Sequence, residues 1–377
     1  MKVGVVGAGA MGSGIAQVAA QSGHQVVLFD QEVDALQNSR SALVKVLNRL
    51  VEKSKLTEEE AVSIQARIRY AEDLREMAGC ELVIEAIVEN LDVKKMVFQR
   101  LEEIIPEDAM LTSNTSSLSI ASLAAGLKYP QRVFGIHFFN PAPLMPLVEI
   151  IPAISSDMEM VQAARSLVDS WGKTTVLAKD TPGFIVNRIA RPFYAEAVKM
   201  LDEGVADAAT IDWAMKTLGG FKMGPFELMD LIGHDVNYVV SETVWTQMYF
   251  DPRYRPSLTQ KRMMEAGLLG RKTGRGFYSY AADAPAPSPN ENEELGQYIL
   301  QRILAMLINE AYDAVFLGIA SERDVELAMT KGVNYPKGLI GWGKEIGLAN
   351  VLSTLDALHQ RFGDDRYRAS ALLRDQA

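Results

Sequence analysis

Residues 2–12, Lys-Val-Gly-Val-Val-Gly-Ala-Gly-Ala-Met-Gly, decide the fold of the N-terminal part of this chain. The apolar start of this stretch predicts a short buried strand, and its last three glycines have the spacing of a dinucleotide-binding turn. Gly7 permits the tight turn, Gly9 lets a pyrophosphate approach the backbone, and Gly12 lets the following helix pack on the strand. Phosphates would meet backbone amides at the start of that helix. The predicted cofactor-binding residues of the turn are Gly7, Ala8, Gly9, Ala10, Met11 and Gly12.

A second predicted strand, residues 25–29, ends at Asp30, 23 residues after Gly7. A carboxylate at this place accepts hydrogen bonds from an adenosine ribose and repels a 2′-phosphate, so the predicted cofactor is NAD and not NADP. The strand, the spacing and the acid together disfavour the alternative, a glycine-rich turn that binds no ligand.

A histidine and a glutamate stand twelve residues apart in residues 131–151. A β-branched run delivers His137, an Asn-Pro turn and further prolines follow, and residues 147–151 read as a second strand that carries Glu149. If the two strands lie side by side, the carboxylate returns to the imidazole. A histidine oriented and made more basic by a glutamate is the usual general base near pH 7. The spacing alone leaves open a strand-end histidine beside a surface glutamate.

Polar loops follow two further predicted strands. Residues 81–88 end at Glu89, and a strand at residues 110–112 runs into Ser-Asn-Thr-Ser-Ser at residues 113–117. An open α/β sheet binds its ligands at such strand ends. The serine-rich run can also cap a helix predicted at residues 120–127, and both readings can hold.

The character of the chain changes at residue 181, where an α/β pattern gives way to helices. A long helix is expected from residue 184 to residue 203, with Asn187 in its first turn. Beyond a linker rich in proline and alanine, many residues recur at a constant offset of 114, which predicts duplication of an all-α domain. Gln301 replaces Asn187 in the second copy, so that copy is interpreted as structural, covering an apolar face of the first.

The predicted architecture is therefore an α/β Rossmann-type dinucleotide-binding domain followed by two tandem all-α domains. The expected boundaries are residues 1–180 for the first domain, 181–280 for the second, 281–294 for the linker, and 295–377 for the degenerate second helical copy.

Composition restricts the class of protein. The 377 residues carry a net charge of −10, which argues against a nucleic-acid surface. The one cysteine, Cys80, excludes a disulfide framework and a cysteine-based metal site, and no metal site is predicted. Neither a secretion signal nor an apolar run long enough to span a membrane is visible, so a cytoplasmic protein is expected.

Six motifs in order carry a resemblance to a known family: residues 7–16, 85–90, 113–117, 137–141, 180–188 and 224–228. With them, the chain resembles the 3-hydroxyacyl-CoA dehydrogenases over residues 1–370. The C-terminal repeat, with Tyr335-Pro336-Lys337-Gly338 and the ending at residues 366–374, looks like the bacterial 3-hydroxybutyryl-CoA and 3-hydroxyadipyl-CoA branch. The resemblance implies NAD-dependent oxidation of an (S)-3-hydroxyacyl-CoA to the 3-ketoacyl-CoA.

The resemblance also implies roles for single residues in catalysis. His137 would take the proton of the 3-hydroxyl group while hydride leaves C3 for the nicotinamide. Glu149 would orient His137 and stabilise the imidazolium. Ser116 and Asn187 would hydrogen-bond the substrate oxygens and thereby organise the alkoxide-like transition state.

Further residues match cofactor and substrate contacts of the family. Asn114, Ser116 and Asn140 would lie near the nicotinamide. Glu89 and Lys94 would reach the neighbouring ribose and phosphate. The remaining matches are Lys272, which corresponds to a cofactor-contacting lysine, and Lys53, which corresponds to a lysine that pairs with the CoA nucleotide. Lys53 belongs to a basic helical segment that can otherwise be a solvated face, and a family serine contacting CoA falls near Val46.

Several alternatives stay open at this point. A non-catalytic NAD-binding protein and a sugar-acid dehydrogenase on this scaffold are the rival functions. The acyl chain can be short and unbranched, or it can end in a carboxylate that Arg188, Arg191 or Lys222 would receive. The family's helical domain forms a dimer, so either a homodimer or a monomer with internally paired helical domains is expected.

Overall fold

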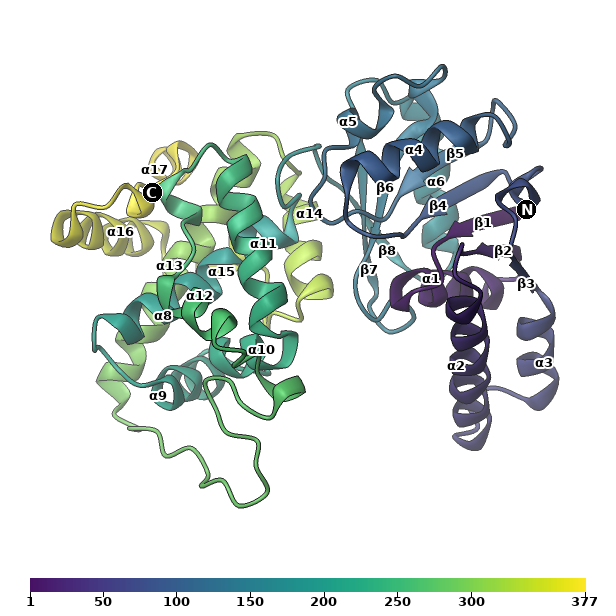
Figure 1. Ribbon diagram of the computed structural model, residues 1–377. Helices are drawn as coiled ribbons and strands as arrows, with labels where there is room; N and C mark the ends of the chain where they lie inside the picture. Colours follow the sequence, from purple (N-terminus) through teal and green to yellow (C-terminus); the bar gives the residue numbers. More distant parts are fainter. The chain divides into compact units, whose positions relative to one another are not determined.

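The computed structural model describes residues 1–377, and the chain divides into two units at Met1–Thr181 and Pro182–Ala377 (Figure 1). The division falls in the Asp-Thr-Pro-Gly stretch where the sequence changes character. The predicted fold class is confirmed, because the first unit contains a mostly parallel sheet with helices and the second unit is helical.

The first unit is built on one sheet with the strand order β3-β2-β1-β4-β5-β6-β7-β8. All neighbouring strands are parallel except β6 and β7, which are antiparallel. The strands are β1 Lys2–Val6, β2 Gln25–Phe29, β3 Ile68–Ala71, β4 Leu82–Glu85, β5 Met110–Ser113, β6 Val133–Phe138, β7 Leu147–Pro152 and β8 Thr174–Leu177.

Helices cover both faces of this sheet because its strands are apolar on both sides. Residues of α1, α2, α3 and α6 share one continuous core with the sheet, whereas buried residues of α4 and α5, such as Phe98 and Leu123, lie outside that core. The helices and 3₁₀ turns are α1 Ala10–Gln21, α2 Val33–Glu52, α3 Glu58–Ala66, η1 Leu74–Met77, α4 Leu91–Glu102, α5 Ile120–Ala124, η2 Pro130–Arg132 and α6 Met158–Ser170.

Thr57 and Glu60 form a capping box at the start of α3, and the short edge strand β3 follows this helix. One local prediction for the first unit is wrong. The strand predicted for residues 81–88 ends at Glu85, because the Glu85 carboxylate accepts a hydrogen bond from the backbone N–H of Ile87 and turns the chain.

The serine-rich run at residues 113–117 does not cap the next helix. Ser119 is the N-cap of α5, and its side chain accepts a hydrogen bond from the Ser122 N–H. The helix also ends at Ala124, earlier than the predicted residue 127. The side chains of the run are bound elsewhere, at the carboxyl edge of the sheet.

The second unit begins with two short helices in place of the predicted single helix over residues 184–203. Phe184 has a φ of +46°, the first helix starts at Val186, and the chain breaks at Ala190, shortly before Pro192. Proline at position 192 lacks a backbone N–H and disfavours a straight continuation. The elements of the first copy are α7 Val186–Ile189, α8 Arg191–Asp202, α9 Ala208–Trp213, η3 Ala214–Leu218, α10 Pro225–Ile232, α11 His234–Gln247, η4 Pro252–Tyr254, α12 Leu258–Glu265 and η5 Arg271–Thr273.

The rest of the second unit repeats this series at the offset found in the sequence. The π-helical turn η3 corresponds to the π-helical turn η6, and α10 and α11 correspond to α15 and α16, each beginning at the equivalent residue. The elements are α13 Glu293–Phe316, α14 Glu322–Leu327, η6 Ala328–Gly332, α15 Leu339–Ile346, α16 Leu348–Phe362, η7 Asp365–Tyr367 and α17 Ala371–Gln376.

The long helix α13 joins the two copies by packing against α8 of the first copy and α15, α16 and α17 of its own. Several buried ion pairs cross between the copies, and two of them are made by equivalent residues. The Arg188 Nε donates to Glu310 Oε1 at 2.8 Å, and the Arg302 Nε donates to Glu196 Oε1 at 2.6 Å. Arg302 is the counterpart of Arg188 and Glu310 that of Glu196, so one contact is made twice, in opposite directions. This reciprocity is typical of an isologous interface.

Candidate active site

The glycines of the turn after β1 are needed for two different reasons: some because the protein leaves no room for a side chain, and one because a ligand would need the space. Gly7 has a φ of +107°, and a Cβ there would lie 2.5 Å from the Ala86 carbonyl oxygen. A Cβ on Gly12 would lie 1.8 Å from the Gly7 oxygen. Gly9 has an ordinary φ of −68°, and a Cβ there would meet nothing within 4 Å. The protein itself therefore requires Gly7 and Gly12, while the bare backbone at Gly9 faces open space and fits a pyrophosphate.

Asp30 stands at the end of β2, directly beside this turn. Its Oδ2 accepts a hydrogen bond from the Ala8 N–H at 2.7 Å, and its Oδ1 accepts one from the Glu32 N–H at 3.0 Å. The carboxylate is half-buried, so one side of it stays open to a ligand. A carboxylate fixed in this way fits the diol of an adenosine ribose.

His137 and Glu149 face each other across the antiparallel pair β6 and β7, where they are direct register partners. The predicted pairing of the two strands is thus confirmed. The His137 Nδ1 lies 2.7 Å from the Glu149 Oε2, and both side chains are buried, Glu149 completely. The alternative of a surface glutamate is wrong. The ring of Phe139 lies 4.6 Å from the imidazole, centroid to centroid, and restricts its orientation.

A buried network of charges lies at the ends of β4 and β5. The Lys94 Nζ is 2.6 Å from Glu85 Oε1 and 3.2 Å from Glu89 Oε2, and its side chain is 1% exposed. The Ser113 hydroxyl donates to the second oxygen of Glu85 at 2.6 Å. Lys94 was predicted to contact the cofactor. Two carboxylates already hold its ammonium group, so any such contact would be made from a fixed position.

The same network arranges the polar loop after β5. The Thr115 hydroxyl and the Ser116 N–H donate to Glu89 Oε1 at 2.5 and 3.1 Å. Burial works to raise the pKa of Glu89, but the Lys94 ammonium and these hydrogen bonds outweigh it and hold that pKa below its ordinary value. Glu89 thus stays anionic and fixes the backbone that carries Ser116.

Two asparagines complete this edge of the sheet. The Asn114 Oδ1 accepts a hydrogen bond from the Phe138 N–H at 2.8 Å, so Asn114 ties the end of β5 to the end of β6, next to His137. Asn140 is exposed in the loop after β6, before a cis proline. Sequence reasoning missed Glu85 and Thr115 as site residues. The sequence feature that could have identified them is a polar residue in a strand or a loop that is expected to be buried.

A groove of about 520 Å³ begins at the glycine turn and runs between α1 and α2. Pro141 and Pro143, from the loop that follows the His137 strand, line its side, and Val46 lies along it on α2. Lys53 is exposed at the C-terminal end of α2, where its side chain forms no ion pair. The groove thus extends from the loop after β6 to α2, the helix that Lys53 follows.

Two predicted site residues belong to the second unit. Asn187 is the second residue of α7, and its backbone carbonyl accepts a hydrogen bond from the Arg191 Nε at 2.8 Å. Lys272 lies in the turn η5, where its Nζ is 2.5 Å from the Asp235 carboxylate.

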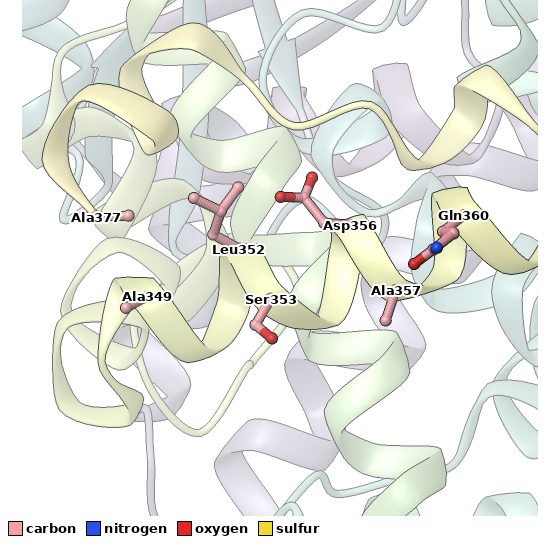
Figure 2. Close-up of a pocket in the computed structure, with 7 residues that line it drawn as sticks. All are labelled: Ala349, Leu352, Ser353, Asp356, Ala357, Gln360 and Ala377. Carbon is pink, nitrogen blue, oxygen red and sulfur yellow. The ribbon is translucent and has the colours of Figure 1, made fainter.

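Figure 2 shows a separate hollow of about 470 Å³ along α16. Asp356 points into it, but this carboxylate pairs with Arg374 at 2.5 Å, and none of the predicted site residues lines the hollow.

No helix of the chain is long and apolar enough to cross a membrane.

Comparison with known proteins agrees with this geometry. Residues 2–181 match the family described as 3-hydroxyacyl-CoA dehydrogenase, NAD binding domain. Residues 183–280 and residues 298–377 both match the description 3-hydroxyacyl-CoA dehydrogenase, C-terminal domain, so the helical domain is recognised twice.

Individual relatives cover the chain to different extents. The chain is 37% identical to the 3-hydroxyadipyl-CoA dehydrogenase of Escherichia coli, over 100% of this chain and 97% of that protein. A probable 3-hydroxybutyryl-CoA dehydrogenase of Deinococcus radiodurans is 44% identical and covers 74% of this chain, with 100% of its own length matched. The crystal structure of a 3-hydroxybutyryl-CoA dehydrogenase from E. coli K12 superposes with a TM-score of 0.94 at 36% identity, covering 100% of this chain and 98% of that one. This chain belongs to the 3-hydroxyacyl-CoA dehydrogenase family.

Proposed function

We propose that this protein is an NAD-dependent dehydrogenase that interconverts an (S)-3-hydroxyacyl-CoA and the corresponding 3-ketoacyl-CoA. The observation that carries the proposal is the buried contact of 2.7 Å between His137 and Glu149, on the same sheet as the glycine turn. A base, a carboxylate that orients it and a dinucleotide-binding turn are the parts that oxidation of a secondary alcohol requires.

In the proposed reaction, His137 acts as the general base. Because Glu149 accepts the hydrogen bond from Nδ1–H, Nε2 is the nitrogen that takes the proton of the 3-hydroxyl group. NAD held at the glycine turn would supply the acceptor for the hydride that C3 loses as its C–O bond becomes a carbonyl. Glu149 stabilises the imidazolium formed in this step, and the reverse reaction returns the same proton.

NAD is favoured over NADP by the position of Asp30. A 2′-phosphate at the ribose would face a carboxylate that already holds the Ala8 amide at 2.7 Å. Glu89, kept ionised by Lys94, is suited to accept hydrogen bonds from the second ribose. Asn114, Asn140 and Lys272 are proposed as further cofactor contacts, on the family resemblance.

The substrate is proposed to run along the groove between α1 and α2, with its CoA nucleotide near Lys53. Ser116, whose backbone Glu89 fixes, and Asn187 are proposed to bind the substrate oxygens. The family serine that contacts CoA falls near Val46, an apolar residue on the wall of this groove, so apolar packing on the CoA arm is proposed there in place of a polar contact.

The test is NADH oxidation with acetoacetyl-CoA, measured for the wild type, for His137→Gln and for His359→Gln. Loss of a general base lowers kcat by roughly 10²–10⁴, whereas the exposed His359 should be replaceable without effect. If NADH binds but no acyl-CoA is reduced, the protein is a non-catalytic NAD-binding relative. If activity is found but free CoA does not compete, a sugar-acid dehydrogenase is favoured.

We also propose that the two helical copies pair within one chain, which makes a monomer in solution the expected state. Support comes from the reciprocal contacts Arg188–Glu310 and Arg302–Glu196, whose side chains are at most 2% exposed. These contacts occupy a face that two separate chains would otherwise share. Light scattering at micromolar concentration tests this, and a homodimer joined through the same face would overturn it.

A further inference from the structure

Arg191 is a buried cation without an anionic partner. It begins α8, four residues after Asn187, and is 6% exposed. No carboxylate lies within ion-pair distance. Its Nε donates to the Asn187 carbonyl at 2.8 Å, and its Nη1 donates to the Ser241 hydroxyl at 3.1 Å and to the Asn237 carbonyl at 3.5 Å. Buried arginines are ordinarily paired with a carboxylate, because an uncompensated buried charge is costly.

Arg188 and Lys222, the other two basic residues that could bind a carboxylate at the end of the acyl chain, have different surroundings. Arg188 is fully engaged, since its guanidinium holds Glu310 at 2.8 Å and Asp313 at 3.1 Å. Lys222 is exposed to solvent and forms no ion pair. Only Arg191 combines burial, proximity to Asn187 and the absence of a carboxylate.

One tyrosine stacks on the Arg191 guanidinium, and a second belongs to the aromatic cluster beside it. The guanidinium carbon lies 5.0 Å from the centre of the Tyr194 ring. Tyr335, contributed by the second helical copy, packs against Phe193 at 5.8 Å, and its buried hydroxyl has no hydrogen-bond partner. Burial lowers the pKa of Arg191, and the neighbouring Tyr194 and Tyr335 counteract this only in part. A guanidinium and an unused hydroxyl are both donors, and together they match a carboxylate.

We propose that Arg191 and Tyr335 receive a carboxylate at the far end of the acyl chain, which makes the substrate a 3-hydroxyacyl-CoA derived from a dicarboxylic acid. This rests on the proposed function, because Asn187 is taken to bind the substrate oxygen near C3. The Arg191 Nε lies 2.8 Å from the Asn187 carbonyl oxygen, so the two residues are in direct contact. A six-carbon chain places its terminal carboxylate carbon three bonds beyond C3, at about 4 Å when extended, within reach of a long arginine side chain beside Asn187.

The site gives the second helical copy a part in substrate selection. Tyr335 lies in the loop between η6 and α15, and its ring also packs against Phe221 of the first copy at 5.0 Å. The degenerate copy has Gln301 in place of the asparagine, yet in this proposal it supplies a hydroxyl to the carboxylate site of the intact copy.

The experiment compares kcat/KM for 3-oxoadipyl-CoA and acetoacetyl-CoA in the wild type and in three variants. Arg191→Met should lower kcat/KM for 3-oxoadipyl-CoA by about 10- to 100-fold, the range for a lost hydrogen bond to a charged group, and leave acetoacetyl-CoA within about threefold. Tyr335→Phe removes only a hydroxyl without a partner, so this variant should fold normally. It should lower the ratio of kcat/KM for 3-oxoadipyl-CoA to kcat/KM for acetoacetyl-CoA by about tenfold. Lys222→Met is the matched control and should leave the ratio unchanged.

Each other outcome overturns the proposal. If Arg191→Met lowers activity on both substrates equally, the arginine only supports α8 and α11. If Lys222→Met alone changes the ratio, the carboxylate binds there. If the wild type reduces acetoacetyl-CoA but not 3-oxoadipyl-CoA, the carboxylate site fails while the proposed dehydrogenase function stands. If neither is reduced, both fail.

Discussion

Replacing Arg302 by methionine tests how the two helical copies are held together. The Arg302 side chain is 1% exposed and binds the fully buried Glu196 at 2.6 Å. It also binds both oxygens of Glu203, at 2.7 and 3.0 Å. Methionine fills part of the same space without a charge. Glu196 then retains one hydrogen bond, from the Tyr367 hydroxyl at 2.8 Å.

The expected cost follows from the difference between the two glutamates. Glu203 is 21% exposed and keeps Lys199 at 3.4 Å, so water and Lys199 compensate its charge. Glu196 has neither, and breaking such a buried pair costs roughly 3–5 kcal/mol. For a unit of this size, 1 kcal/mol shifts Tm by about 2–4 °C, which predicts a fall in Tm of roughly 6–20 °C.

Thermal and urea unfolding followed by circular dichroism would measure this change. The matched control is Arg374→Met, which breaks an exposed pair with Asp356 and should cost at most about 1 kcal/mol. Adding Glu196→Gln to Arg302→Met should restore part of the stability, because it removes the stranded charge. If Arg302→Met unfolds within 1 kcal/mol of the wild type, the buried pair is not what joins the copies and the reasoning is refuted.

Two further predictions concern the first unit. Gly9→Ala should leave the free energy of unfolding within about 1 kcal/mol of the wild-type value yet weaken NADH binding by about 10- to 100-fold. Gly12→Ala should instead cost about 1–3 kcal/mol of stability, because its Cβ would lie 1.8 Å from the Gly7 oxygen. Fluorescence titration measures NADH affinity and urea unfolding measures stability, and an unchanged NADH affinity in Gly9→Ala would contradict the role of Gly9. Lys53→Met should raise KM for acetoacetyl-CoA by about three- to tenfold at low salt and less at high salt, with Lys55→Met as the neighbouring control; equal effects of the two variants would indicate only a general surface charge.

The parts of the site that could be predicted from the sequence are those whose signal is local. The glycine turn and Asp30 have fixed spacing because one turn and one strand set their positions. His137 and Glu149 were predicted as a pair because a short connector rich in proline joins two β-branched segments. In both cases the contact is made between elements that follow one another in the chain.

Other features depend on contacts that no local pattern reveals. Glu85, Lys94 and Ser113 meet only because β4 and β5 are neighbours in the sheet, and their order along the chain does not state that. Burial of the Arg191 guanidinium without a carboxylate is likewise a property of packing. From the sequence, Arg191 was one of three basic residues that could bind a terminal carboxylate. It stands out only when the structure shows that Arg188 is paired with carboxylates and that Lys222 is exposed.

The direction of β7 explains why His137 and Glu149 can be so close in the sequence. Parallel neighbours require a crossover of a dozen or more residues, usually through a helix. Every other neighbouring pair in this sheet is parallel, and β6 with β7 is the single antiparallel junction. Because β7 runs back along β6, residue 149 stands directly opposite residue 137 after a connector of eight residues, 139–146. The reversal thus delivers a carboxylate from inside the sheet, where it is fully buried, to an imidazole at the edge where the polar loops begin. A glutamate in a loop would face water, and solvent would screen its charge from the imidazole.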